Sequence, residues 1–141
     1  MATTTATITL ASADMMDNSL SISNTATLYT AGTNTGITET TGLSRKKFAT
    51  ASEFKLLDFG LAGSQMADVT ADKSAKVYIK NLNDRGDGTK YVAVLINSIE
   101  IGRLYGGDWC FFPWSGGNDK DIDIDPYDAT ETTLEYTCFF E

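Results

Sequence analysis

Hydrophobic and polar residues alternate with a period of two along much of this chain. In residues 75–82, Val77 and Ile79 alternate with polar or amphipathic neighbours, and residues 121–125 and 132–140 repeat the pattern. Such alternation is typical of β-strands with one buried face. Because no segment of comparable length has a helical period, the pattern predicts an all-β protein.

Turn-forming residues separate these segments at short intervals. A β-branched run over residues 90–101 is expected to bend at Asn97 and Ser98, and turns rich in Gly or Asp fall at residues 83–88 and 106–108. Short strands joined by such turns indicate an antiparallel β-sandwich or jelly roll.

The first part of the chain alternates in the same way, in a Thr-rich context. Ile8 and Leu10, and then Leu20 and Ile22, are flanked by Thr, Ser or Ala. Two interpretations of residues 1–20 stay open: ordered strands, packed for example on a neighbouring subunit, or an N-terminal arm without fixed structure. In both cases the length of 141 residues suits one β-sandwich domain.

Aromatic residues are concentrated between residues 109 and 114. In a strand, Trp109 and Phe111 face one way, while Cys110, Phe112 and Trp114 face the other. A sheet with one solvated face does not carry aromatic residues on both faces. Three interpretations stay open: a core on both faces, a subunit interface, or a platform on which sugars stack. The sugar platform would comprise Trp109, Trp114, Tyr105 and Tyr127.

Charge is concentrated at the end of the chain, whose net charge is -8. Residues 1–107 hold ten acidic and ten basic residues, whereas residues 108–141 hold nine acidic residues and Lys120 as the single base. Phosphate binding needs clustered Lys and Arg, so we expect neither nucleic acid nor an anionic membrane as a partner. The acidic segment favours a basic protein partner.

The single cluster of consecutive basic residues also has two interpretations. Arg45, Lys46 and Lys47 are either polar residues that lead into a strand carrying Phe48, or an anchor on an acidic patch of a neighbouring subunit. The second interpretation makes the acidic end of another copy a natural partner for this cluster.

The aspartates of the acidic segment have a predictable direction. In a strand, Asp121, Asp123 and Asp125 share one face, while the isoleucines between them point to the core. That face is solvated, or it meets a basic protein or a calcium ion. The EF-hand pattern is absent because, counted from Asp121, its Gly and Glu positions hold Pro126 and Thr132. We expect no cofactor and keep calcium as an alternative, with Asp119 and Asp128 as further ligands.

The composition argues against an enzyme. The chain has no histidine, so it has no histidine base and no histidine metal ligand, and its two cysteines cannot complete a four-ligand zinc site. Residues 1–7 lack the positive and apolar regions of a signal peptide, which predicts synthesis in the cytoplasm. We therefore expect Cys110 and Cys138 to be buried free thiols, with a cross-strand disulfide as the alternative.

Several short motifs in the second half occur in an order that is characteristic of one group of proteins. The motifs are Val77-Tyr78-Ile79-Lys80-Asn81, Phe111-Phe112-Pro113-Trp114-Ser115-Gly116, Asp121-Ile122-Asp123-Ile124 and Leu134-Glu135-Tyr136. In these motifs, residues 75–141 resemble small β-sandwich virion proteins of tailed bacteriophages, especially marine and cyanobacterial phages. The many aspartates after Gly117 and the two cysteines depart from that group, and no functional residue carries over.

The resemblance implies a structural component of the virion that is made in the host cytoplasm and has no cofactor. We expect a capsid decoration or cement protein that binds the major capsid protein of the assembled shell as a homo-oligomer, with a trimer as one option. The alternatives are a tail or head–tail connector subunit, or a carbohydrate-binding module for host adhesion. The candidate interface residues are Arg45, Lys46, Lys47, Trp109, Phe111, Trp114, Asp121, Asp123 and Asp125.

Overall fold

The computed structural model describes residues 3–13, 19–33, 36–48, 52–58, 74–86, 91–116, 120–127 and 131–141. In these residues every regular element is a β-strand, and every strand pair is antiparallel. The prediction of an all-β, antiparallel fold is confirmed. The described part of the chain has no helix with the length and hydropathy of a membrane span.

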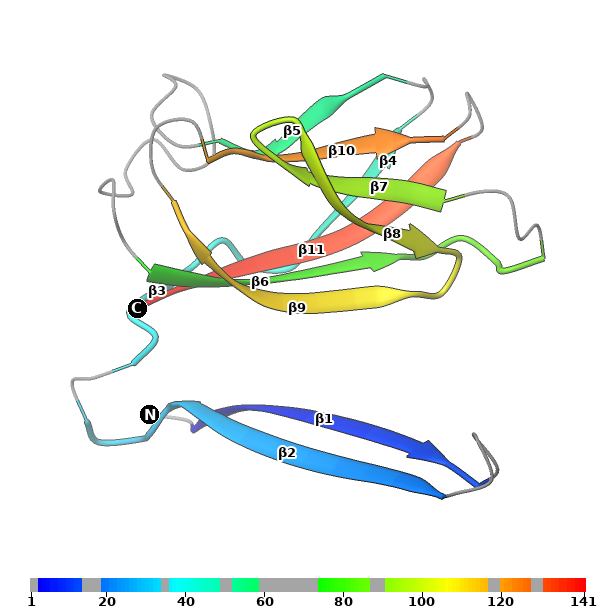
Figure 1. Ribbon diagram of the computed structural model, residues 1–141. Coiled ribbons are helices and arrows are strands. Elements are labelled where there is room, and N and C mark those ends of the chain that lie inside the picture. The colour runs from blue at the N-terminus through cyan, green and yellow to red at the C-terminus, as the bar shows by residue number, and fades with distance from the viewer. Residues whose placement is uncertain are drawn as a thin grey trace. The chain divides into compact units, whose positions relative to one another are not determined.

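Contacts divide the chain into two compact units, residues 1–38 and residues 39–141. The first unit is a hairpin of β1 (Thr4–Ser12) and β2 (Leu20–Tyr29), drawn in blue in Figure 1. The prediction is one domain over residues 1–141, with an N-terminal arm over residues 1–20 as an open option, and this arm span contains β1 and only the first residue of β2. The domain assignment stays a prediction, to which the structure adds a boundary after residue 38.

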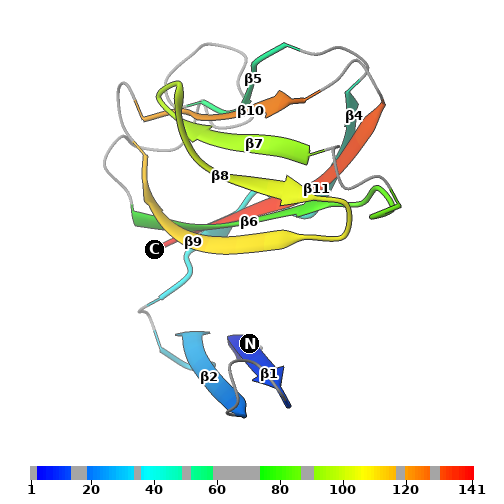
Figure 2. The same cartoon turned by 45° about the vertical axis from the view of Figure 1, so that its right-hand side comes forward.

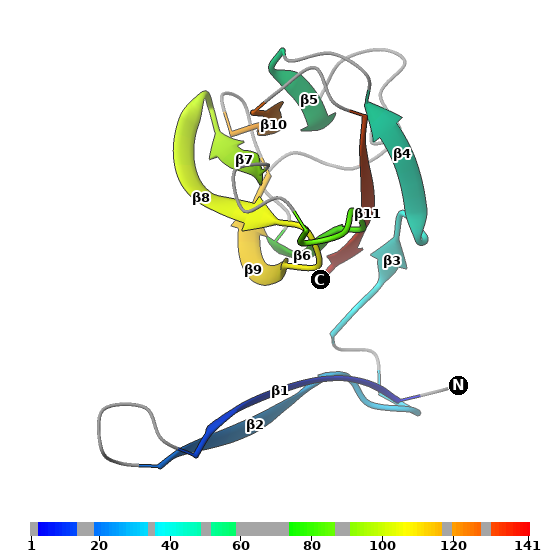
Figure 3. The same ribbon diagram turned by 90° about the vertical axis from the view of Figure 1, so that its right-hand side faces the viewer.

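The second unit contains two sheets that pack together as a sandwich (Figure 2). The four-stranded sheet contains, in spatial order, β5 (Phe54–Leu57), β10 (Ile122–Pro126), β7 (Tyr91–Ile96) and β8 (Ile99–Tyr105). The five-stranded sheet contains, in spatial order, β3 (Glu39–Thr40), β11 (Thr132–Phe140), β6 (Ser74–Asn81) and β9 (Trp109–Ser115), and β4 (Ser44–Phe48) also pairs with β11. Figure 3 shows the strands of both sheets arranged around the core.

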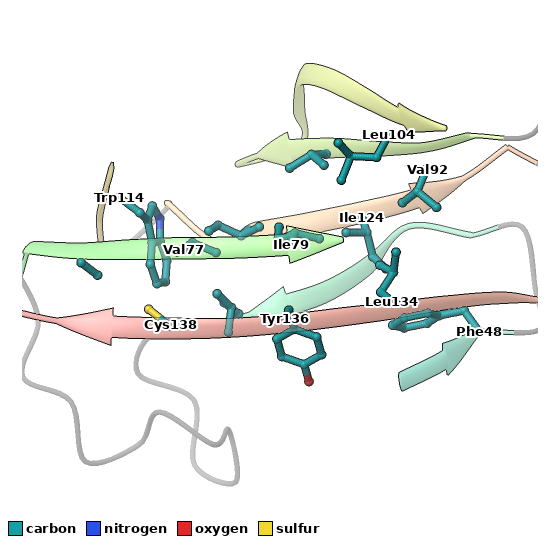
Figure 4. Packing of buried hydrophobic residues seen from close by; sticks show 14 of the residues in the cluster. Phe48, Val77, Ile79, Val92, Leu104, Trp114, Ile124, Leu134, Tyr136 and Cys138 are labelled. Carbon is teal, nitrogen blue, oxygen red and sulfur yellow. The ribbon is translucent and has the colours of Figure 1, made fainter. Parts of the chain in front are cut away.

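The core lies between the inner faces of these two sheets (Figure 4). From the five-stranded sheet, Val77 and Ile79 on β6 are fully buried, and so are Ile122 and Ile124 on β10 of the opposite sheet. Their direction is the one that the alternation predicted. Burial of such side chains is the main favourable term in folding, so these strands hold the two sheets together.

The expected bend at Asn97 and Ser98 is a complete hairpin turn between β7 and β8. Both residues have positive φ angles, 50° and 60°. Two central residues with positive φ are the signature of a type I′ turn, whose twist matches that of the flanking strands. The long β-branched run is therefore two strands, and Ile96 pairs with Ile99 across the turn.

We expect Ser98→Gly to raise the free energy of unfolding by about 0.5–1 kcal/mol, because glycine adopts a positive φ without the steric cost of a Cβ atom. Ser98→Ala is the matched control: it also removes the hydroxyl that donates to Glu53 at 2.7 Å, but it keeps Cβ. Urea unfolding followed by circular dichroism measures the difference. Equal stability of the two variants would contradict a conformational cost at this turn.

Candidate functional site

Aromatic side chains from three strands gather on the outer face of the five-stranded sheet. Phe111 on β9 lies opposite Tyr78 on β6, and Trp109 and Phe139 belong to the neighbouring rows of the same face. Residues opposite each other in paired strands project to the same side of a sheet. Trp109 is 48% exposed and the other three are partly buried. We call these four residues the aromatic face.

Basic side chains share this side of the sheet with the aromatic face. They are Arg45 and Lys47 on β4 and Lys76 and Lys80 on β6. Lys80 lies directly opposite Trp109, and Lys76 contacts the carboxylate of Glu141. Lys47 pairs with Glu131 at 2.5 Å, where both side chains are more than half exposed. The aromatic residues are therefore interleaved with and flanked by cations.

A hydrogen-bonded carboxylate joins the aromatic and basic residues. Glu135 on β11 accepts hydrogen bonds from Arg45 Nε at 2.8 Å and from the Tyr78 hydroxyl at 3.4 Å. Burial raises the pKa of Tyr78, and the charge of Glu135 raises it further, so the hydroxyl remains a donor. The Arg45 side chain is thereby held over the sheet while it stays 67% exposed.

The structure brings together some of the candidate interface residues and separates others. Trp109, Phe111, Arg45 and Lys47 all lie on the outer face of one sheet. Lys46 alternates to the opposite side of β4, where its Nζ lies 5.4 Å from the ring centroid of Phe48. Sequence reasoning missed Tyr78, Phe139 and Glu135 as members of the site. Alternation along β6 and β11 was the signal that could have found them.

Trp114 is a core residue and not a surface residue. Its side chain belongs to the core cluster, only 4% of the residue is exposed, and its indole Nε1 donates to the carbonyl of Lys120 at 2.7 Å. A buried indole whose N–H donates a hydrogen bond agrees with the interpretation of this stretch as part of an ordinary core. Cys110 and Phe112 also pack against this cluster, as the alternation predicted.

The four residues predicted as a sugar platform do not converge. Tyr105 and Tyr127 belong to a separate group around Tyr91, whose ring centroid lies 5.6 Å and 4.8 Å from theirs. The guanidinium of Arg103 lies 4.5 Å from the centroid of Tyr91. Trp109 is on the other sheet and Trp114 is in the core. The tyrosine group is thus a distinct aromatic surface, of which Tyr105 and Tyr127 were predicted as platform residues and Tyr91 and Arg103 were not.

The prediction of one solvated face for the three aspartates is wrong for Asp123. This residue is only 3% exposed, whereas Asp125 is exposed and Asp121 is partly buried. Asp121 accepts a hydrogen bond from Lys55 Nζ at 2.5 Å, and the same ammonium group lies 3.5 Å from Asp58. Asp123 and Asp125 are on β10 and Asp121 directly precedes it, in the sheet opposite to the aromatic face, so the three aspartates do not form one surface with Arg45 and Lys47.

The carboxyl group of Asp123 is incompletely hydrogen-bonded. Its Oδ2 accepts the backbone N–H of Ser98 at 3.3 Å, and its Oδ1 has no hydrogen-bond partner among the described residues. Burial raises the pKa of Asp123, and the nearby charges of Glu53 and Asp121 raise it further. The charged form is therefore disfavoured in the folded state.

Neither the acidic residues nor the cysteines form a recognisable reactive site in the described residues. No three of the described Asp, Glu and Cys side chains are placed to hold a metal ion, and Asp119 and Asp128 lie outside the described residues. Cys110 and Cys138 are free thiols on β9 and β11, which are separated by β6. Burial raises their pKa to about 11 and about 12, so both are neutral near pH 7.

Comparison with family models found no match for this chain, and comparison with curated proteins found no match either. The features that bear on function are therefore the aromatic face, the tyrosine group and the acidic residues around β10. Among them, the aromatic face combines exposed aromatic area with flanking charge, whereas Asp121, just before β10, and Asp123, on β10, are engaged within the chain.

We expect Asp123→Asn to raise the free energy of unfolding at pH 7 by about 1 kcal/mol, because it removes a buried charge with an unsatisfied oxygen. A carboxyl whose pKa is raised on folding contributes stability below its unfolded pKa and loses it as the pH rises through the folded pKa. The difference between variant and parent should thus shrink as the pH falls towards 4.

Urea unfolding at a series of pH values measures this dependence. Asp125→Asn is the matched control, since it removes an exposed carboxylate from the same strand and is expected to change stability little. An Asp123→Asn protein less stable than the parent at pH 7 would show that the ionised carboxylate is favoured.

Proposed function

We propose that this chain is a structural protein of a bacteriophage virion, and specifically a decoration or cement protein that binds the assembled capsid shell as a homo-oligomer. The aromatic face is the observation that carries this proposal, because aromatic side chains on the outer face of a sheet are suited to contact with another protein. The resemblance of residues 75–141 to phage β-sandwich virion proteins supports the proposal. The protein works by burying surface, with no chemical step.

The composition of the aromatic face fits a protein interface. The solvated face of an antiparallel sheet is normally polar, yet this face carries Trp109, Phe111, Tyr78 and Phe139. Aromatic residues and Arg are enriched in interface cores and supply most of the residues whose loss weakens binding strongly. Trp109 has the most area to bury, since it is 48% exposed.

The charges around the aromatic face favour an acidic partner surface. Arg45 and Lys47 are bonded to glutamates within the chain but remain mostly exposed. Exposed ion pairs contribute little to stability, so these cations can also interact with carboxylates of a partner at the rim of the contact. Such charges set the orientation and rate of binding more than its strength.

One specific observation favours carbohydrate binding as a second candidate function. In the tyrosine group, the Tyr91 ring is in contact with the rings of both Tyr105 and Tyr127, and Arg103 lies over it. Tyr127 is 57% exposed, and an exposed ring beside a polar side chain is suited to stacking on a sugar. This surface is separate from the aromatic face, so variants can distinguish the two functions.

We expect Trp109→Ala to weaken binding to capsids by roughly thirtyfold, about 2 kcal/mol, because Trp109 is the most exposed aromatic residue of the aromatic face. Co-sedimentation with shells assembled from the major capsid protein of the same phage genome measures the affinity. Tyr127→Ala is the matched control, since it removes an exposed aromatic ring from the other sheet and should leave capsid binding unchanged.

The alternatives give different results in the same experiments. Loss of glycan binding on Tyr127→Ala, with no capsid binding by the parent protein, would replace the decoration function by host adhesion. Binding to isolated tails or connectors but not to shells, again lost on Trp109→Ala, would move the protein to the tail or the head–tail junction. Full capsid binding by Trp109→Ala would exclude the aromatic face as the contact.

A further inference from the structure

The hairpin of β1 and β2, which we call the hairpin arm, has one polar and one apolar face. Hydroxyl pairs line the polar face, with Thr7 and Thr25 2.9 Å apart and Thr9 and Ser23 3.5 Å apart. On the other face Leu10 lies opposite Ile22. The pairing places the apolar side chains of Ala6, Ile8, Leu10, Leu20, Ile22 and Ala26 on that face, together with the polar side chains of Ser12 and Asn24.

The apolar face of the hairpin arm is exposed at Leu10, Leu20 and Ile22, whereas Ala6 and Ile8 are partly buried. Leu10, Leu20 and Ile22 are 52%, 38% and 41% exposed. An isolated two-stranded hairpin is at best marginally stable in water, and needs a further layer or strand to bury its apolar side. The described residues of its unit provide no third strand. A stable arm of this kind therefore needs a partner surface.

The edges of the hairpin arm also lack the features that usually prevent association. Residues 3–13 and 19–33 contain no charged side chain and no proline. Natural proteins protect exposed edge strands with charges, especially Lys, with proline, or by covering them. The strands here are nine and ten residues long, which offers an extended backbone edge for pairing.

The strands of the hairpin arm carry no charge, and this favours another copy of the same chain as their partner. The chain carries a net charge of -8, and the described strands of the arm contribute none of it. An arm recognised by a charged partner would carry complementary charges. Against the aromatic face, an uncharged arm would cover Arg45, Lys80 and Glu135 without supplying them a new partner, which is costly. The strands of the identical arm in another copy have no charge to desolvate, because the two acidic residues of the hairpin, Asp14 and Asp17, fall in the sequence between the strands.

We propose that the hairpin arms of two or more copies of this chain pack against one another through their apolar faces, and that this contact holds the homo-oligomer together. Self-complementary surfaces are the rule in symmetric oligomers. Acidic copies repel one another, and contact through the uncharged strands of the arms keeps that repulsion small. This inference rests on the homo-oligomer of the proposed function. It assigns the contact between copies to a surface other than the one that binds the capsid.

The test is the mass of the full-length protein at micromolar concentration, by size exclusion with light scattering. The parent should have a multiple of the monomer mass of 15.2 kDa, and Leu10→Ser combined with Ile22→Ser should reduce it to that mass. Thr7→Ser combined with Thr25→Ser, on the polar face, is the matched control and should keep the parent's mass. Unchanged thermal unfolding of the sandwich would show that the variant is folded.

Cross-linking gives a second measurement that does not depend on destabilising the arm. Ala6→Cys and Thr7→Cys place thiols at adjacent positions on the apolar and polar faces. Cys110 and Cys138 have raised pKa values of about 11 and about 12 and react slowly at pH 7. A short bismaleimide should join copies of the Ala6→Cys protein at least several times more than copies of the Thr7→Cys protein.

The outcomes separate this inference from the proposed function. A monomeric parent, or a Leu10→Ser, Ile22→Ser protein with the parent's mass, would overturn the arm contact whether or not capsids are bound. Equal cross-linking of the two cysteine variants would overturn it as well. A parent that oligomerises through its arms but ignores shells and tails would support the arm contact and reject the virion function.

Discussion

The pairing of β11 with β6 is the constraint on which the rest of the sandwich depends. β11 also pairs with β3 and β4, and β6 also pairs with β9, so these two strands position every other strand of their sheet. Leu134, Cys138 and Phe140 on β11 are fully buried and face the core with the inward residues of β6. Because side chains alternate, the same pairing fixes which residues face outward. The aromatic face is therefore a direct consequence of how the core is built.

The parts of the structure that depend on local pattern were predictable from the sequence. Val77 and Ile79 point inward, and so do Cys110 and Phe112, because alternation within a strand is a property of a few consecutive residues. The turn at Asn97 is local as well, although its tight hairpin geometry needed the structure. Half of the aromatic face followed from this reasoning, through Trp109 and Phe111.

The parts that depend on strand order were not predictable. Asp123 points away from the core, as alternation requires, yet it is buried between strands that come from distant parts of the sequence, with Lys55 on one side and Leu95 on the other. The cysteines illustrate the same limit, since nothing local reveals that β6 lies between their strands. Tyr78 and Phe139 joined the site only once the register of β6, β9 and β11 was known.

The position of the two thiols has a consequence for where the folded chain can function. Cys138 is fully buried, Cys110 is largely covered, and an intervening strand keeps them from meeting. Disulfide exchange requires an accessible thiolate, and the folded sandwich offers little of one. The two thiols are thus protected from disulfide exchange for as long as the sandwich stays folded, in a reducing as in an oxidising solution.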